Sequence, residues 1–129
     1  MKPYKYGILG TCALGVGMVA SANQVPEMNF DQKVKRSTLV VLGSVENLDC
    51  CSSGSSSGME RGIAHVQVVT YLKGRSAARI KVLYKTGIRE FDPNCCEIGK
   101  RYLFLLTGEK DDIYRSVNGP YGIFEVGTP

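Results

Sequence analysis

Cysteine carries the widest range of chemistry in this 129-residue chain, and its spacing limits what that chemistry is. Four of the five cysteines form two adjacent pairs, Cys50-Cys51 and Cys95-Cys96. Paired thiols can form structural disulfides, hold zinc or undergo reversible oxidation. Zinc knuckles and redox centres both use C-x-x-C spacing, which this chain lacks, so the pattern favours disulfides.

Four cysteines can be joined into two disulfides in three ways. A bond within an adjacent pair closes an eight-membered ring. Bonds between the pairs close a loop of about 45 residues, worth roughly 4 kcal/mol on the chain-entropy model. We therefore expect Cys50 and Cys51 to be bridged to Cys95 and Cys96, and the pattern does not choose between the parallel and the crossed connection. Metal binding or thiol redox chemistry at the cysteine pairs is an alternative.

The residues that catalyse acid–base and nucleophilic reactions are sparse. His65 is the single histidine, and a lone histidine in a strand is usually a hydrogen-bonded structural residue. Residues 54–58 match G-x-S-x-G only within a serine-glycine tract, not at a strand-to-helix turn. The closest acidic pairs are near turns, where they should be solvated: Glu90/Asp92 and Asp111/Asp112. We expect no catalytic residue, no cofactor and no resident metal.

Tyrosines are the remaining candidates for a binding site. A row of aromatic side chains on a small barrel can stack on single-stranded nucleic acid. In a chain of modest net charge, core packing and loop contacts explain the aromatics better, so we expect no nucleic-acid partner. Tyr121 lies between Pro120 and Gly122 on a turn and is the best candidate contact. His65 and Tyr71, on one face of a predicted strand, are the others.

The amino terminus has the three parts of a secretory signal peptide. Lys2 and Lys5 precede an uncharged stretch at 6–19, and Ala20-Ser21-Ala22 follows as an A-x-A cleavage site. The stretch is short and broken by glycines, which disfavours an uncleaved membrane anchor. Lipid attachment at Cys12 is disfavoured because more apolar sequence follows it. We expect residues 1–22 to be removed and the protein to be secreted or held in the periplasm or cell envelope, without a membrane span.

The mature chain has the size of one small domain. Loss of Lys2 and Lys5 lowers the basic residues from 16 to 14 against 12 acidic residues, so the net charge falls from +4 to +2. A domain of this size buries only about two-thirds of the surface of its unfolded chain. Covalent links are therefore plausible in an oxidising compartment.

The sequence predicts that β-strands position these candidate residues. Stretches rich in β-branched and aromatic residues occur at 37–47, 63–73, 78–86, 101–107, 113–117 and 123–126. The first should bend near Gly43, and 101–107, apolar on both faces, should be the most buried. Residues 23–35 should be irregular, and 91–98 hold at most one helical turn. The pattern predicts an all-β domain over 36–129, a small barrel or sandwich of five or six strands.

Four short motifs resemble those of netrin-like domains, the family of the tissue inhibitors of metalloproteinases. They are LVVLGSV at 39–45, VVTYLKG at 68–74, a cysteine ahead of GKRYLF at 99–104, and GPYGIF at 119–124. The resemblance covers roughly residues 34–126. It implies an OB-like Greek-key barrel of five strands.

One family feature is missing. Inhibitory members begin with Cys-x-Cys, whose first cysteine chelates the zinc of the target protease, whereas the mature chain would begin Asn23-Gln24-Val25. The resemblance therefore implies the scaffold and not the inhibitory wedge. We expect a non-catalytic binding module whose partner is a protein outside the cytoplasm. A protease inhibitor that acts through another loop is the first alternative.

Signal cleavage is directly testable. Because Ala20 and Ala22 supply small residues at the −3 and −1 positions, the exported protein should be about 2 kDa smaller than the precursor and begin at Asn23. Intact mass and amino-terminal sequencing measure this. A lipid on Cys12 or an uncleaved terminus would contradict it.

Overall fold

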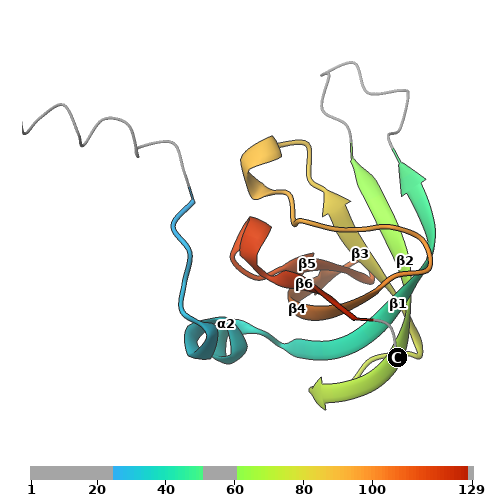
Figure 1. Cartoon of the computed structure of the whole chain (residues 1–129), viewed down its shortest axis with the longest axis horizontal. Coiled ribbons are helices and arrows are strands. Elements are labelled where there is room, and N and C mark those ends of the chain that lie inside the picture. Colours follow the sequence, from blue (N-terminus) through green and yellow to red (C-terminus); the bar gives the residue numbers. More distant parts are fainter. Residues whose placement is uncertain (1–24, 51–60, 128–129) are drawn as a thin grey trace, which may run out of the picture.

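A sheet that closes on itself forms the body of the molecule (Figure 1). The structure is a computed structural model, and it describes residues 25–50 and 61–127. In chain order, the elements are α2 (Phe30–Arg36), β1 (Leu39–Cys50), β2 (Gly62–Lys73), β3 (Arg79–Lys85), η1 (Arg89–Phe91), β4 (Arg101–Lys110), β5 (Ile113–Ser116), η2 (Gly119–Tyr121) and β6 (Ile123–Val126). All six predicted strands are present. The serine-glycine tract lies outside the described residues.

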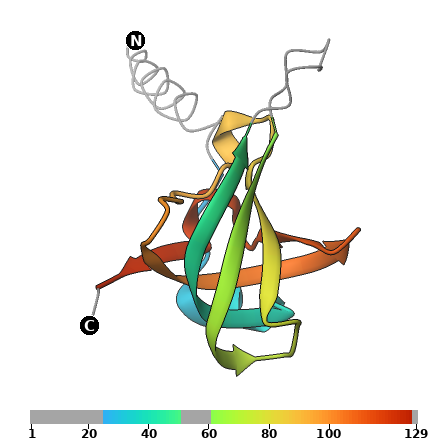
Figure 2. The ribbon, with the colours of Figure 1, turned by 90° about the vertical axis from the view of Figure 1, so that its right-hand side faces the viewer.

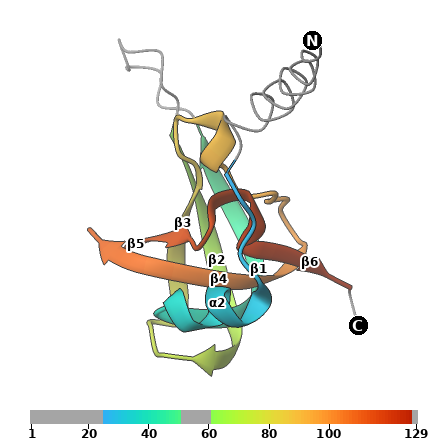
Figure 3. The same cartoon turned by 90° about the vertical axis from the view of Figure 1, so that its left-hand side faces the viewer.

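Five of the strands form a ring in the order β1-β2-β3-β5-β4, which a second pairing between β1 and β4 closes. β3 and β5 are parallel, and the other neighbours are antiparallel. β6 pairs with the first half of β4, and β5 pairs with the second half. Figures 2 and 3 show β4, β5 and β6 running across the three strands β1, β2 and β3. This is the Greek-key OB-type barrel that was expected.

Side chains of alternate parity on each strand fill the barrel. Phe104 is fully buried at its centre, with Val41, Val66 and Val82 from β1, β2 and β3. Because neighbouring residues of a strand point to opposite faces, Leu105 lies on the outer face of β4, yet it is also fully buried. It packs there with Val40, Val117 and Val34 of α2. β4 is therefore covered on both faces, as its sequence predicts.

β1 must bend because it pairs with β2 along its length and with β4 along its first half. The irregularity predicted at Gly43 is present as a register shift between Leu42 and Gly43 in the β1–β2 ladder. A side chain at Gly43 would clash with the side chain of Val66 and the carbonyl of Gln67. The position therefore requires glycine because of close approach, not because of its backbone angles.

The prediction that 23–35 is irregular is wrong for its second half, where α2 forms. Asn29 caps the helix by accepting a hydrogen bond from the Gln32 amide at 2.9 Å. Lys33 lies on the buried face, and its ammonium reaches Glu27 at 2.9 Å. A seven-residue helix is marginal in isolation, so its packing on β4 stabilises it. Such contacts between distant segments leave little signal in the local sequence.

Phe104 provides a test of the core. Phe104→Ala should lower the free energy of unfolding by about 3 to 5 kcal/mol, because the side chain is fully buried and its loss leaves a cavity. The matched control is Phe30→Ala on α2, where the side chain is 52% exposed and the change should be within about 0.5 kcal/mol. Denaturant titration of both variants measures this. Equal effects would contradict the assignment of the core.

Candidate functional site

The connection between β3 and β4 begins with a short, well-anchored turn. Asp92 Oδ1 accepts hydrogen bonds from both the backbone amide and the hydroxyl of Thr86, each at 2.8 Å. The Ile88 amide donates to the same hydroxyl at 3.1 Å, and the Phe91 amide closes η1 on the Ile88 carbonyl at 2.9 Å. These bonds tie the two ends of the turn together. η1 is therefore held in one orientation despite being three residues long.

η2 lies beside η1 and is shaped by residues with positive φ. Asn118 has a φ of 63° and Gly119 a φ of 55°, so the chain turns sharply after β5. A Cβ on Gly119 would lie 3.3 Å from the Phe91 carbonyl, which shows how closely the two turns approach. Asn118 also anchors the amino-terminal segment: its Oδ1 accepts from the Met28 amide at 2.7 Å, and its Nδ2 donates to the Pro26 carbonyl at 2.9 Å.

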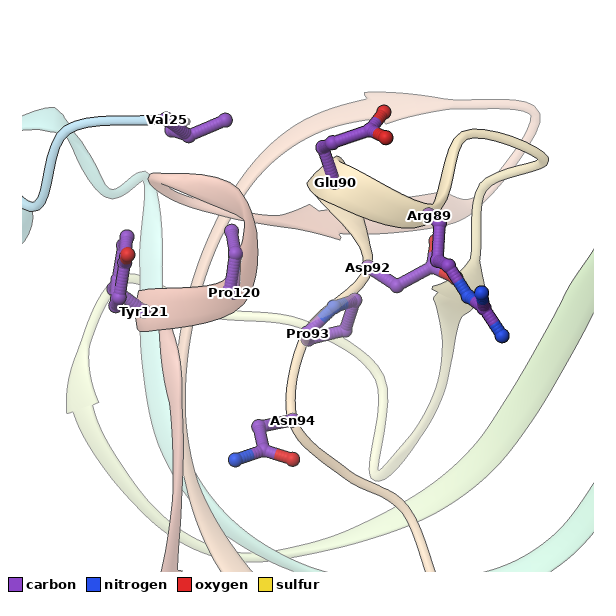
Figure 4. Close-up of a pocket in the computed structure, with 8 residues that line it drawn as sticks. All are labelled: Val25, Arg89, Glu90, Asp92, Pro93, Asn94, Pro120 and Tyr121. Atoms are coloured by element: carbon purple, nitrogen blue, oxygen red, sulfur yellow. The ribbon is translucent and has the colours of Figure 1, made fainter. Parts of the chain in front are cut away.

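A pocket of about 470 Å³ lies between the two turns (Figure 4). We call it the η1–η2 pocket. Its lining residues are Val25, Arg89, Glu90, Asp92, Pro93, Asn94, Pro120 and Tyr121. Pro120 and Tyr121 form one side, and the residues from η1 onward form the other (Figure 4). Three separate segments thus build the pocket: the amino-terminal stretch, the β3–β4 connection and η2.

The charges of the η1–η2 pocket suit binding better than proton transfer. Asp92 is committed to Thr86, so its carboxylate holds the turn. Arg89 and Glu90 are both exposed and supply one charge of each sign at the rim. Tyr121 is half-buried in the wall, with the Lys33 ammonium 5.7 Å from its ring centre. Its role as a contact stays a prediction.

η1 also exposes apolar surface. Ile88 and Phe91 are 43% and 47% exposed, although large apolar side chains usually lie inside a domain of this kind. Residues of a turn held by side-chain hydrogen bonds cannot fold these groups inward without breaking those bonds. The turn therefore presents two ordered apolar side chains to solvent, next to the η1–η2 pocket.

The other predicted contacts lie elsewhere on the barrel. His65, on β2, has its Nε2 2.6 Å from Asp49 Oδ2 on β1, a cross-strand pair on the outside of the sheet. Burial, reinforced by the Asp49 carboxylate, raises the pKa of the nearby Tyr84 hydroxyl. Tyr71 donates to the carbonyls of Ser76 and Ala77 at 2.8 and 3.0 Å, which closes the β2–β3 turn. Tyr121, His65 and Tyr71 therefore do not form one site.

The expectation of disulfides between the two cysteine pairs is wrong. Cys95 and Cys96 are bonded to each other. Cys50 is also disulfide-bonded. The physical reason is position. The chain after Cys96 joins β1 at Val45, whose backbone bonds to Gly99 and Lys100. Five further strand residues, roughly 16 Å, carry Cys50 beyond that point.

The loop-closure argument therefore does not apply to the Cys95–Cys96 bond, because the loop it closes contains no intervening residue. Cys96 is buried and belongs to the barrel core, and Cys95 packs against the same core. Among the described residues, no three histidine, cysteine, aspartate or glutamate side chains come together as ligands for a metal ion.

Sequence reasoning missed Ile88 and Phe91. The available signal was two large apolar residues in a turn-rich stretch between strands, anchored by a Thr86 and an Asp92 able to bond each other. An apolar residue in such a stretch is normally assigned to the core. Its exposure follows from the direction of the turn, which periodicity does not predict.

The comparisons with known proteins add no relative: no protein-family model matches the chain, and no curated protein matches it. In the part of the chain that the structure describes, no helix has the length and apolar character needed to cross a bilayer.

The disulfide arrangement can be tested by peptide mapping. Trypsin places Cys50 and Cys51 in the peptide 37–61 and Cys95 and Cys96 in the peptide 90–100. Because Cys95 is bonded to Cys96, an unreduced digest should release 90–100 as a free peptide, lighter by two hydrogen atoms than its reduced form. Mass spectrometry with and without reductant measures this. Release of the two peptides as one covalent species would contradict the structure.

Proposed function

We propose that this chain is an exported, non-catalytic binding module of netrin-like, OB type, whose partner is a protein outside the cytoplasm. The observation that carries the proposal is the pair of exposed apolar side chains at η1, Phe91 and the preceding Ile88, held rigidly beside the η1–η2 pocket. Ordered apolar groups next to a hollow, rimmed by charges, are typical of the centre of a protein–protein interface.

Rigidity favours binding because less conformational entropy is lost when the partner docks. Thr86 and Asp92 fix the base of η1, and Gly119 packs against the backbone of Phe91. The amino-terminal segment is fixed by Asn118. The three segments that line the η1–η2 pocket are thus ordered before any partner arrives.

The hydrogen bonds of the two groups best suited to proton transfer support a binding function over a catalytic one. The Asp92 carboxylate is occupied by Thr86, and His65 pairs with Asp49 on the outside of β1 and β2. Within residues 25–50 and 61–127, neither is hydrogen-bonded to a nucleophile and an orienting group together, as covalent catalysis requires. A surface that binds without reacting accounts for the exposed residues more simply.

Export is supported by the signal-peptide pattern at 1–22 and by the disulfide state of the cysteines. Disulfides persist in oxidising compartments and are rare in the cytosol. The OB-type barrel is the fold that the netrin-like motifs imply, so it supports that relationship as well. Because both the signal-peptide pattern and the disulfides support export, the partner is expected outside the cytoplasm as well.

Site-specific photo-crosslinking tests the location of the partner. The full chain, with a photoreactive phenylalanine analogue at Phe91 or at Tyr121, should give a discrete covalent adduct with a protein of the cell envelope or medium. The control places the analogue at Leu72 on β2, which is 59% exposed but away from η1. Gel electrophoresis after irradiation measures this.

A second variant separates the order of η1 from its mere exposure. Thr86→Val keeps the shape of the side chain but removes the hydroxyl that bonds Asp92, so the adduct at Phe91 should weaken several-fold while the fold is retained. If the analogue at Leu72 gave an adduct as strong as those at Phe91 and Tyr121, or if only Leu72 gave one, the proposed binding surface would be wrong.

A further inference from the structure

Two further hollows lie on the outer face of β3 and β5. Both hollows are lined by Arg61, Leu83 and Arg115, and we call them together the arginine groove. The first, of about 350 Å³, is also lined by Phe91 of η1 and by Ile88, which precedes η1. The second, of about 190 Å³, continues from it along the strands.

The β-ladder places the groove residues side by side. Leu83 of β3 lies directly opposite Arg115 of β5 in the parallel pairing, so both side chains stand on the same outer face. Leu83 is only 5% exposed and forms an apolar floor. Ile88 and Phe91 extend this apolar surface toward η1, while the two arginines add positive charge along it.

The two arginines lack the carboxylate partners that Arg79 and Lys100 have. Arg79 pairs with Glu46, and Lys100 pairs with Glu97 and Glu125. Among the described residues, neither the Arg61 nor the Arg115 guanidinium forms an ion pair or a hydrogen bond. Asp111 lines the second hollow without bonding to either of them. Two arginines beside an apolar floor thus have their donor groups available.

We infer that the arginine groove binds an acidic peptide segment of the partner, in which an apolar side chain is flanked by carboxylates. The apolar side chain would lie on Leu83, Ile88 and Phe91, and the carboxylates would accept hydrogen bonds from Arg61 and Arg115. Arginine suits this role because its planar guanidinium can bond a carboxylate at two points. This inference rests on the proposed function and names the chemistry of its partner.

The shape of the groove favours an extended peptide over a compact small molecule. The hollows follow one another along the strands, and each has the size of one or two side chains. The smaller is below the range of about 300 to 1,000 Å³ that is typical of small-molecule sites. An extended chain also places alternate side chains about 7 Å apart, so consecutive hollows can receive them.

Nuclear magnetic resonance titration of the mature, nitrogen-15-labelled protein tests this inference. The probe is the peptide acetyl-Glu-Gly-Phe-Gly-Glu-amide, in which both glutamates lie on the same side as the phenylalanine when the chain is extended. The comparison peptide has glutamine in place of both glutamates. The acidic peptide should shift the amide signals of Leu83, Phe91 and Arg115. The glutamine peptide should bind about fivefold more weakly, since two exposed ion pairs are lost, and high salt should reduce the difference.

Matched variants locate the charge effect. Arg61→Gln/Arg115→Gln should reduce the preference for the acidic peptide to near one. Arg36→Gln/Arg75→Gln removes the same net charge from exposed positions outside the groove and should keep the preference. Signals that shift only elsewhere, or equal affinity for the two peptides, would overturn the inference.

Inorganic phosphate provides the remaining control. If phosphate alone at the same concentration shifts the same signals as strongly as the acidic peptide, the groove is an anion site and the peptide inference fails. Failure of the peptide with intact crosslinking at Phe91 or Tyr121 would leave the proposed function standing. Loss of both results would remove the two proposals together.

Discussion

The pairing of β1 with β4 is the interaction on which the rest of the structure depends. Six residue pairs, from Leu39–Leu106 to Ser44–Arg101, join segments separated in the chain by β2 and β3. Without this ladder, β1 and β4 would be the two open edges of a five-stranded sheet, each with unpaired backbone groups. Closure buries the central side chains from all directions, and it also fixes where the connections leave the barrel.

Two of those connections carry the candidate surface. The β3–β4 connection must leave β3, pass the end of the barrel and return to β1, so it has length to spare for η1 and for the Cys95–Cys96 segment. The β5–β6 connection forms η2 because Asn118 and Gly119 adopt positive φ. Where the two turns meet, neither is needed to complete the core. Their side chains are therefore available for binding while the barrel supplies the rigidity.

Period-two alternation and β-branched residues were sufficient to predict the strands, because each strand has a buried face. Periodicity does not show which strands pair. The choice of a closed barrel over a sandwich therefore came only from the netrin-like motifs, and the structure is such a barrel. α2 escaped prediction because Lys33 and Val34 are stabilised by β4, β6 and Glu27 rather than by local pattern. The loop-entropy argument predicted the wrong disulfide pairing. The direction in which β1 runs, and not the length of the loop, decides which thiols come close together.

Lys33 gives the molecule an internal reporter of local opening. Its side chain is 2% exposed, and its ammonium lies between Glu27 of the amino-terminal segment and the Phe124 ring, 5.0 Å from the ring centre. An amine-reactive reagent can label Lys33 only when its side chain becomes accessible. Lys35, two residues away, is exposed and serves as an internal reference. The ratio of labelling at the two lysines therefore measures how often α2 and residues 25–29 detach from the barrel, without any substitution in the protein.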